Sequence, residues 1–418
     1  MGAFPIPRYI FDIMLIAAAL IVCCAEARGA ASFHRAELIF PLEDYHNHSS
    51  CIVEQPNGDL LACWYRGVGP EKGDDVTVMG GRKPQGSDAW SERFAMADTP
   101  GYPDNNPCML VDPEGRLWLF WVTLLANRWQ TALLKYRVSR DYETRDGPPV
   151  WEWQDVIPVT PADFEEQMNA GLDAYFERYR DLAARAPQGA VKHLRATRDQ
   201  AGDKLYQRLG WMTRVHPILL PRPTAGGQAS ARLIVPLYSD NYDVSLMAMT
   251  DDWGRTWQTS DALVGVGNVQ PSVVRKDDGT LVVMMRENGL QRRIRISESQ
   301  DDGLTWSPVE NMDLPNPGAS VEVIRLANGH WALVHNDTAL GRHSLAVSIS
   351  DDEGKTWRWT RHLERSSAGS GSYSYPSLIQ ARDGTLHATY SYSPGGGRGE
   401  SIKHAAFNEE WVIEGDGN

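Results

Sequence analysis

The sequence has few of the residues that would mark a disulfide-rich, zinc-binding or nucleic-acid-binding protein. Only three of its five cysteines, Cys51, Cys63 and Cys108, lie beyond residue 24, and their spacing matches no zinc site. Lysine and arginine number 41 against 54 aspartates and glutamates, so the net charge is −13. A chain without a dominant basic patch is poorly suited to nucleic acid or to an anionic membrane. We expect neither as a partner, and no metal or other cofactor.

The cysteines also limit covalent cross-linking. An odd number permits at most one disulfide, for which Cys51 and Cys63 are the candidates. Three buried free thiols are the alternative that we favour.

Long apolar runs are absent except near the N-terminus. Arg8 precedes a run over residues 10–24 that is interrupted by Asp12, and Ala25-Glu26-Ala27 fits a small-residue cleavage site. The run is too short for a convincing membrane span. We therefore predict a signal peptide over residues 1–27 and a secreted or periplasmic mature chain over 28–418. A retained N-terminal anchor is the alternative.

A repeat organises the rest of the chain. Each copy has a polar or small residue, then Pro or Ser, a short apolar run, a turn and a second apolar run. The copies begin at His48, Asn106, His216, Gln270, Ala319 and Tyr375. They recur about every 50 residues with one doubled step, and each contains a hairpin pattern, which is typical of a β-propeller. We predict an all-β, six-bladed β-propeller that acts as a monomer.

A second motif recurs in the later copies. The pattern Ser/Thr-x-Asp-x-Gly-x-Thr-Trp occurs at Thr250–Trp257, Ser299–Trp306 and Ser350–Trp357. The aspartate can accept hydrogen bonds from backbone N–H groups, the glycine can adopt positive φ, and the tryptophan can pack between strands. We expect these aspartates to fix turns.

The doubled step indicates an insertion at about residues 160–210. Thr160-Pro161 resembles a helix start, and apolar residues follow at helical spacing from Phe164 to Leu182. A second helical pattern covers about 191–209. We predict an inserted helical hairpin that packs on the outside of the propeller or covers its pocket as a lid.

The six repeats and the three Asp-containing turns resemble the sialidase (neuraminidase) superfamily, in its bacterial BNR or Asp-box branch. The resemblance implies a tyrosine nucleophile, a glutamate partner, an aspartate acid/base and three arginines that bind a carboxylate. Tyr375 resembles the nucleophile, while Arg286 and Arg342 resemble two of the arginines. Asp75 is our candidate for the acid/base.

The sequence departs from this pattern at two places. Gln270 stands where the glutamate is expected, and His48 precedes serines where the first arginine is expected. A glutamine cannot accept a phenol proton as a carboxylate does, whereas His48 could bind the carboxylate when charged.

Further site residues follow from the geometry of a propeller, in which first-strand starts and second-strand ends converge on one mouth. We expect a catalytic role for Glu322, beside Tyr375, Asp75 and Gln270. Beside Arg286 and Arg342, which the resemblance implies, we expect substrate binding by His48, Asn106, Arg214, His216, Arg66 and Asn336.

The sequence therefore predicts an exo-sialidase-like glycoside hydrolase that removes a terminal acidic sugar from a glycan. One alternative is a polysaccharide lyase for uronate-containing glycans, in which His48, His216 and Tyr375 serve the proton transfer. The other alternative, which Gln270 favours, is a propeller that binds glycans without catalysis.

Overall fold

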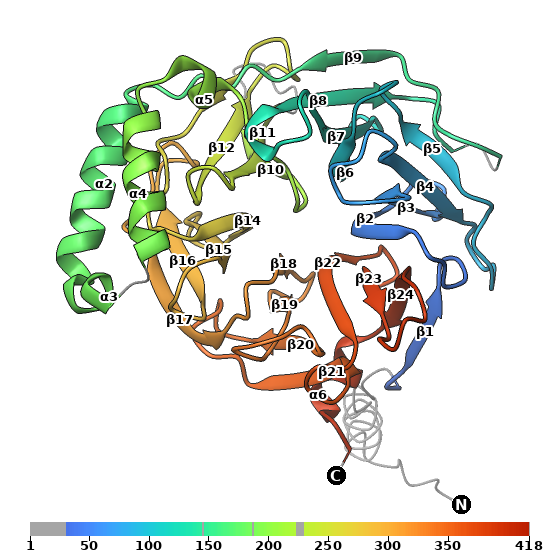
Figure 1. The fold of residues 1–418 in the computed structure, drawn as a ribbon. Coiled ribbons are helices and arrows are strands. Elements are labelled where there is room, and N and C mark those ends of the chain that lie inside the picture. The colour runs from blue at the N-terminus through green and yellow to red at the C-terminus, as the bar shows by residue number, and fades with distance from the viewer. Residues whose placement is uncertain (1–30, 144–145, 186–187, 223–229, 418) are drawn as a thin grey trace, which may run out of the picture.

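The computed structural model describes residues 31–143, 146–185, 188–222 and 230–417. In this part of the chain, six four-stranded antiparallel sheets surround one axis like the blades of a propeller (Figure 1). The all-β, six-bladed fold predicted from the repeats is confirmed. The proposed signal segment over residues 1–27 lies outside the described residues.

Each blade supplies one strand to the axis. These inner strands are β2 (His46–Glu54), β6 (Asp104–Val111), β10 (Ile218–Arg222), β14 (Asn268–Arg275), β18 (Glu322–Arg325) and β22 (Ser372–Gln380). The second strands are β3 (Leu60–Gly67), β7 (Leu117–Leu124), β11 (Ser230–Ser239), β15 (Leu281–Glu287), β19 (Trp331–His335) and β23 (Leu386–Ser393).

The outer half of each blade consists of two further strands. The third strands are β4 (Thr77–Lys83), β8 (Ala132–Ser139), β12 (Val244–Thr250), β16 (Arg293–Ser299), β20 (Ser344–Ser350) and β24 (Ser401–Phe407). The fourth strands are β5 (Phe94–Ala97), β9 (Trp153–Val156), β13 (Gln258–Thr259), β17 (Glu310–Pro315), β21 (Trp359–Arg365) and β1 (His34–Leu38).

The last blade is closed by the first strand of the chain. Its sheet has the order β1-β24-β23-β22, and His34 to Leu38 pair antiparallel with Phe407 to Lys403. The N-terminal strand therefore joins the two ends of the ring, which leaves no gap between the first blade and the last.

A β-bulge interrupts four of the six inner strands at equivalent positions. Strand pairing skips Ser49-Ser50, Asn106-Pro107, Gln270-Pro271 and Tyr375-Pro376. The first residue of each pair has a left-handed φ of 50–59°. A proline fits here because a bulge residue need not donate to the ladder. The match corrects the predicted alignment of the first repeat by one residue, since Ser49, not His48, is equivalent to Tyr375.

The predicted aspartate turns are present between the third and fourth strands of three blades. In the second of them, Asp301 accepts hydrogen bonds from the Thr305 N–H at 2.9 Å and from the Ser299 hydroxyl at 2.8 Å. Asp252 and Asp352 make the same contacts. These aspartates hold turns and lie far along each blade from the inner strands.

The helical insertion consists of α2 (Phe164–Arg178), α3 (Arg180–Arg185), α4 (Gln188–Gln200) and α5 (Lys204–Arg208). Helix α2 begins at Phe164, after Asp163, and not at the predicted Thr160-Pro161 cap. The Arg178 guanidinium contacts Glu310 of β17 at 3.0 Å, and Gln167 contacts Asp261 at 2.8 Å. Helices α2 and α4 therefore lie beside the outer edge of the ring (Figure 1).

The remaining elements are the 3-10 turn η1 (Trp129–Thr131) and the C-terminal helix α6 (Glu409–Glu414). Apolar side chains of neighbouring blades form the core, and Cys51, Cys63 and Cys108 are buried in it as free thiols. Within the described residues, no helix is long and apolar enough to cross a membrane.

Candidate active site

Tyr375 lies at the centre of a group of side chains from four blades. Its hydroxyl oxygen accepts a hydrogen bond from Arg286 Nη1 at 3.0 Å, and Gln270 Nε2 lies 3.4 Å away. Tyr375 belongs to β22, Gln270 to β14 and Arg286 to β15. The bulges at positions 270 and 375 turn both side chains toward the axis. A tyrosine in the left-handed region costs about 1–2 kcal/mol, so other contacts must hold it there.

Arginines surround the phenol ring. The guanidinium carbons of Arg214 and Arg342 lie 5.1 Å and 5.3 Å from the ring centroid of Tyr375. Burial alone would raise the pKa of Tyr375, but the charges of Arg286 and Arg342 outweigh it and lower that pKa below its usual 10.0. The phenol of Tyr375 therefore loses its proton more easily than that of a free tyrosine, and the phenolate is the more nucleophilic form.

Two of these arginines keep N–H groups free for a ligand. Arg342 donates from Nη2 to the carbonyl of Gly318 at 2.8 Å, and Arg286 Nε is buried without a hydrogen-bond partner among the described residues. A planar guanidinium with unpaired N–H groups can bind a carboxylate through two of them.

His48 packs against the nucleophile candidate. Its ring centroid is 4.1 Å from that of Tyr375, and its Nε2 lies 4.0 Å from Glu71 Oε1. Burial lowers the pKa of His48 well below 6.5, so this ring is neutral at pH 7. His48 therefore offers a lone pair and cannot supply the positive charge suggested by the sequence.

Glu71 is the carboxylate of the β3–β4 loop that reaches the site. It accepts a hydrogen bond from the Tyr65 hydroxyl at 3.2 Å and pairs with His46 at 3.3 Å. Burial would raise its pKa, but His46, His48 and Tyr65 lower it to about 2. Glu71 is thus ionised and stabilises positive charge on His46, whereas His48 stays neutral.

Tyr238 and Asp240 bring blade 3 into the site. Asn106 Nδ2 donates to the Tyr238 hydroxyl at 3.1 Å, and Gln270 Nε2 lies 3.3 Å from the same oxygen. Asp240 follows β11, and its charge interacts with those of Arg286, Glu71 and Lys72. Burial raises the pKa of Asp240 to about 6, so it is a carboxyl that can carry a proton near neutral pH.

Three predicted site residues lie deeper along the axis. Glu322 is 1 % exposed and accepts from His216 Nδ1 at 2.6 Å and from the Leu378 amide at 3.0 Å. His216 Nε2 contacts Cys51 Sγ at 3.2 Å. Arg214 is also 1 % exposed and donates to backbone carbonyls. These contacts join blades to one another and engage the Glu322 carboxylate, both ring nitrogens of His216 and the two terminal nitrogens of Arg214.

The remaining predicted residues have contacts of their own. Asp75 accepts a hydrogen bond from the Val68 amide within its loop. Arg66 pairs with Glu43 at 2.8 Å, and Asn336 donates to the Tyr373 carbonyl at 2.9 Å. Glu71 and Asp240 are therefore further carboxyl candidates beside Asp75, because the charge of Glu71 acts on Tyr375 and that of Asp240 acts on Arg286.

Sequence reasoning missed Tyr238 and Asp240, although the signal was available. Both follow from the rule that second-strand ends reach the mouth, applied to β11 as it was to β15. The helical insertion and the longer hairpin obscured where the second strand of blade 3 ends.

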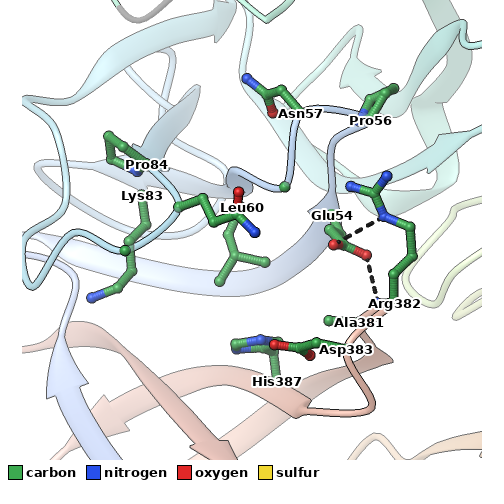
Figure 2. A pocket seen from close by; sticks show the side chains of 13 residues that line it. Glu54, Pro56, Asn57, Leu60, Lys83, Pro84, Ala381, Arg382, Asp383 and His387 are labelled. Atoms are coloured by element: carbon green, nitrogen blue, oxygen red, sulfur yellow. Dashed lines mark hydrogen bonds and ion pairs between the residues drawn. The ribbon is translucent and has the colours of Figure 1, made fainter.

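A hollow of about 530 Å³ lies between the turns of blades 1 and 6 (Figure 2). Its Arg382 is paired with Glu54 at 3.2 Å, and its Lys83 is paired with Glu37 at 2.6 Å. Because these charges are already compensated, the hollow is a weaker candidate for an anionic ligand than the arginines around Tyr375.

A six-bladed propeller with aspartate turns and an axial tyrosine among arginines defines a protein of the sialidase-like propeller class. The family model of the BNR repeat-like domain matches residues 58–164 and 213–388, which is more than half of the chain. The chain belongs to this family, within the sialidase superfamily.

Two curated relatives are similar over part of the chain. The sialidase of Micromonospora viridifaciens is 30% identical over 173 residues, which cover 39% of this chain and 25% of that protein. The anhydrosialidase of Macrobdella decora is 26% identical over 184 residues, which cover 39% of this chain and 24% of that protein. The matched region spans about a quarter of the length of each relative.

Solved structures share the fold. A Dyadobacter fermentans protein of unknown function has a TM-score of 0.63 and 15% identity, and the match covers 90% of this chain and 99% of that one. The NanB sialidase of Streptococcus pneumoniae has a TM-score of 0.63 and 12% identity, with coverage of 90% and 71%. The intramolecular trans-sialidase of Ruminococcus gnavus has a TM-score of 0.61 and 13% identity, with coverage of 88% and 95%.

Proposed function

We propose that this chain is a glycoside hydrolase that removes a terminal acidic sugar, such as a sialic acid, from glycans. The observation that supports this most directly is the Tyr375 hydroxyl, held by Arg286 with the charges of Arg214 and Arg342 nearby. A phenol is a suitable nucleophile for an anionic sugar because, when neutral, it does not repel the substrate as a carboxylate would.

The proposed reaction has two steps. Arg286 and Arg342 bind the carboxylate of the sugar and place its anomeric carbon at the phenol oxygen. The Tyr375 oxygen forms a bond to this carbon as the glycosidic bond breaks, and Asp240 donates its proton to the leaving oxygen. Asp240 then takes a proton from water, which attacks the same carbon and releases Tyr375. The configuration at the anomeric carbon is retained.

Activation of the phenol differs from that implied by the family resemblance. Gln270 has no carboxylate to accept the phenol proton. In its place, the positive charges around Tyr375 lower the pKa of the phenol itself. The phenol then loses its proton to solvent more easily than a free tyrosine does, and Gln270 serves as a neutral partner to the oxygen.

One contact favours a second candidate, a polysaccharide lyase. The neutral His48 ring packs on Tyr375 at 4.1 Å, beside arginines that can neutralise a uronate carboxylate. A base and a phenol at such a carboxylate could remove the adjacent proton and eliminate the glycosidic oxygen. An increase in absorbance from an unsaturated uronate would identify this reaction.

The decisive experiment is product analysis with a panel of sialylated and uronate-bearing glycans. We expect release of the free acidic sugar by the wild type. We expect Tyr375→Phe to reduce kcat at least about a hundredfold while binding is kept, because the nucleophilic oxygen is lost. No turnover by either protein on any glycan, with binding intact, would instead indicate a non-catalytic glycan-binding propeller.

The acid assignment has its own comparison. Asp240→Asn should lower kcat strongly, whereas Asp75→Asn should change it little, because Asp75 binds the backbone of its own loop. The reverse result would restore Asp75 as the acid. We also propose that the enzyme acts outside the cytoplasm, on the basis of the signal-like residues 1–27.

A further inference from the structure

A short segment of blade 3 contacts the inner strands of other blades at the axis. It runs from Thr213 to His216, between α5 and β10, and does not pair as part of a sheet. Thr213 Oγ1 donates to the Asn106 carbonyl at 2.7 Å, and His216 Nε2 lies 2.8 Å from the Ile52 carbonyl. Its side chains thus hold backbone carbonyls next to the bulges of the first two blades.

Arg214 makes the corresponding contact beside Tyr375. Its Nη2 donates to the Pro376 carbonyl at 2.6 Å, and its Nη1 donates to the Ser50 carbonyl at 3.3 Å. These carbonyls belong to the second residues of two equivalent bulges, in blades 6 and 1. One guanidinium therefore connects the bulge that carries Tyr375 to its counterpart in the neighbouring blade.

The burial of Arg214 requires an explanation. Its side chain is 1 % exposed, and none of its contacts within the described residues is an ion pair with a carboxylate. A charged group so placed is costly unless polar groups surround it. The two carbonyls and the face of the Tyr375 ring at 5.1 Å supply that environment.

We propose that Arg214 is a positioning residue that holds Tyr375 in its left-handed bulge, with the phenol oxygen at Arg286. Lysine could keep the charge but not the planar fork that reaches both carbonyls. Without the fork, the peptide after Tyr375 can relax toward an extended conformation, which moves the phenol away from Arg286. The kinetic part of this proposal rests on the proposed hydrolase function, whereas its structural part does not.

The test compares Arg214→Lys and Arg214→Met with the wild type. Ultraviolet titration of each protein against its Tyr375→Phe counterpart isolates the ionisation of this one phenol. We expect its pKa to rise by about one unit or more in both variants, because the phenol leaves Arg286. On a cleaved glycan, kcat should fall at least about tenfold in Arg214→Lys with KM changed less than about twofold.

Arg295→Met is the matched control. Arg295 is also fully buried and donates to a single backbone carbonyl, that of Gly265 at 2.9 Å, away from Tyr375 in blade 4. Its loss should lower thermal stability. It should not shift the titration of Tyr375, and it should not reproduce the selective loss of kcat over KM that we expect for Arg214→Lys. A general loss of packing would affect both arginine sites alike.

The proposal is overturned if a folded Arg214 variant keeps the wild-type Tyr375 titration, or if Arg295→Met shifts it equally. Should Arg214→Met not fold, Arg214→Lys still decides the question. Failure of the wild type to cleave any glycan would contradict the hydrolase function alone, because the titration of Tyr375 needs no substrate. A crystal structure of Arg214→Lys with the Arg286 contact intact would also refute it.

Discussion

Asp240, which we propose as the general acid, illustrates how a catalytic role can cost stability. It lies where burial opposes its charge, and its pKa is raised from 3.8 to about 6. A carboxyl with such a pKa remains protonated in a useful fraction of molecules near neutral pH, which a general acid requires. The same shift means that ionised Asp240 is less stable in the folded protein than in the unfolded chain.

This balance predicts the behaviour of Asp240→Asn. Because the folded pKa is raised, the group favours folding below pH 3.8, and this contribution is lost as pH rises to about 6. The neutral amide avoids that loss, so the variant should be more stable at pH 7 by roughly 1–3 kcal/mol, with little gain at pH 4. Thermal melts at both pH values measure this. A variant that is less stable at pH 7 contradicts the placement of Asp240.

At the same scale, the sequence predicted which residue types meet but not their depth along the axis. Tyr375, Gln270 and His48 were expected together, and their side chains contact one another or share a partner at the mouth. Glu322 was expected at the mouth too, but it is buried deeper along the axis, where it accepts a hydrogen bond from His216. Along an inner strand, the mouth and the core are only a few residues apart. The repeats align with one another to about the same number of residues, so they do not predict at which of the two levels a side chain lies. The one-residue error at Ser49 has the same origin.

At the scale of the elements, the aspartate turns are local and were therefore readable from sequence. All their contacts join residues within a few positions of one another, as in Ser299, Asp301 and Thr305. The helical insertion was also recognisable from the helical spacing of its apolar residues, but its position against the propeller was not. Packing of Gly171 against Val264, and of Gln167 on Asp261, depends on residues about 90 positions away.

The turns can be tested by Asp301→Ala, with Gln300→Ala as the control at an exposed neighbour. The change removes acceptors for the Thr305 amide and hydroxyl, so we expect a loss of about 1–3 kcal/mol of stability at pH 7. Burial, the largest single effect, would raise the pKa of Asp301, but these hydrogen bonds together outweigh it and lower that pKa. The stabilisation is therefore lost as pH falls through that lowered pKa, and the two proteins should converge in acid. Chemical denaturation at several pH values measures this. Unchanged stability at pH 7 would contradict a structural role.

At the scale of the whole molecule, the candidate site depends on closure of the ring. Tyr375 comes from blade 6, His48 from blade 1, and Gln270 and Arg286 from blade 4. No blade contains the site by itself, so relative movement of blades 1 and 6 would separate His48 from Tyr375. The contact between these blades is secured at the periphery by β1, which pairs with β24 at the outer edge of the last sheet.

Closure can be tested by comparing a chain that begins at Ala31 with one that begins at Ile39 and so lacks β1. The shorter chain loses the ladder between His34–Leu38 and Lys403–Phe407, and each net hydrogen bond contributes about 0.5–1.5 kcal/mol. We expect a lower melting temperature and a more than proportional loss of activity, because Tyr375 and His48 are no longer held together. A synthetic peptide covering residues 31–38 should restore both by adding a strand to the exposed edge of β24. A scrambled peptide of the same composition is the control. Equal melting temperatures for the two chains would show that the ring is closed by contacts between inner strands alone.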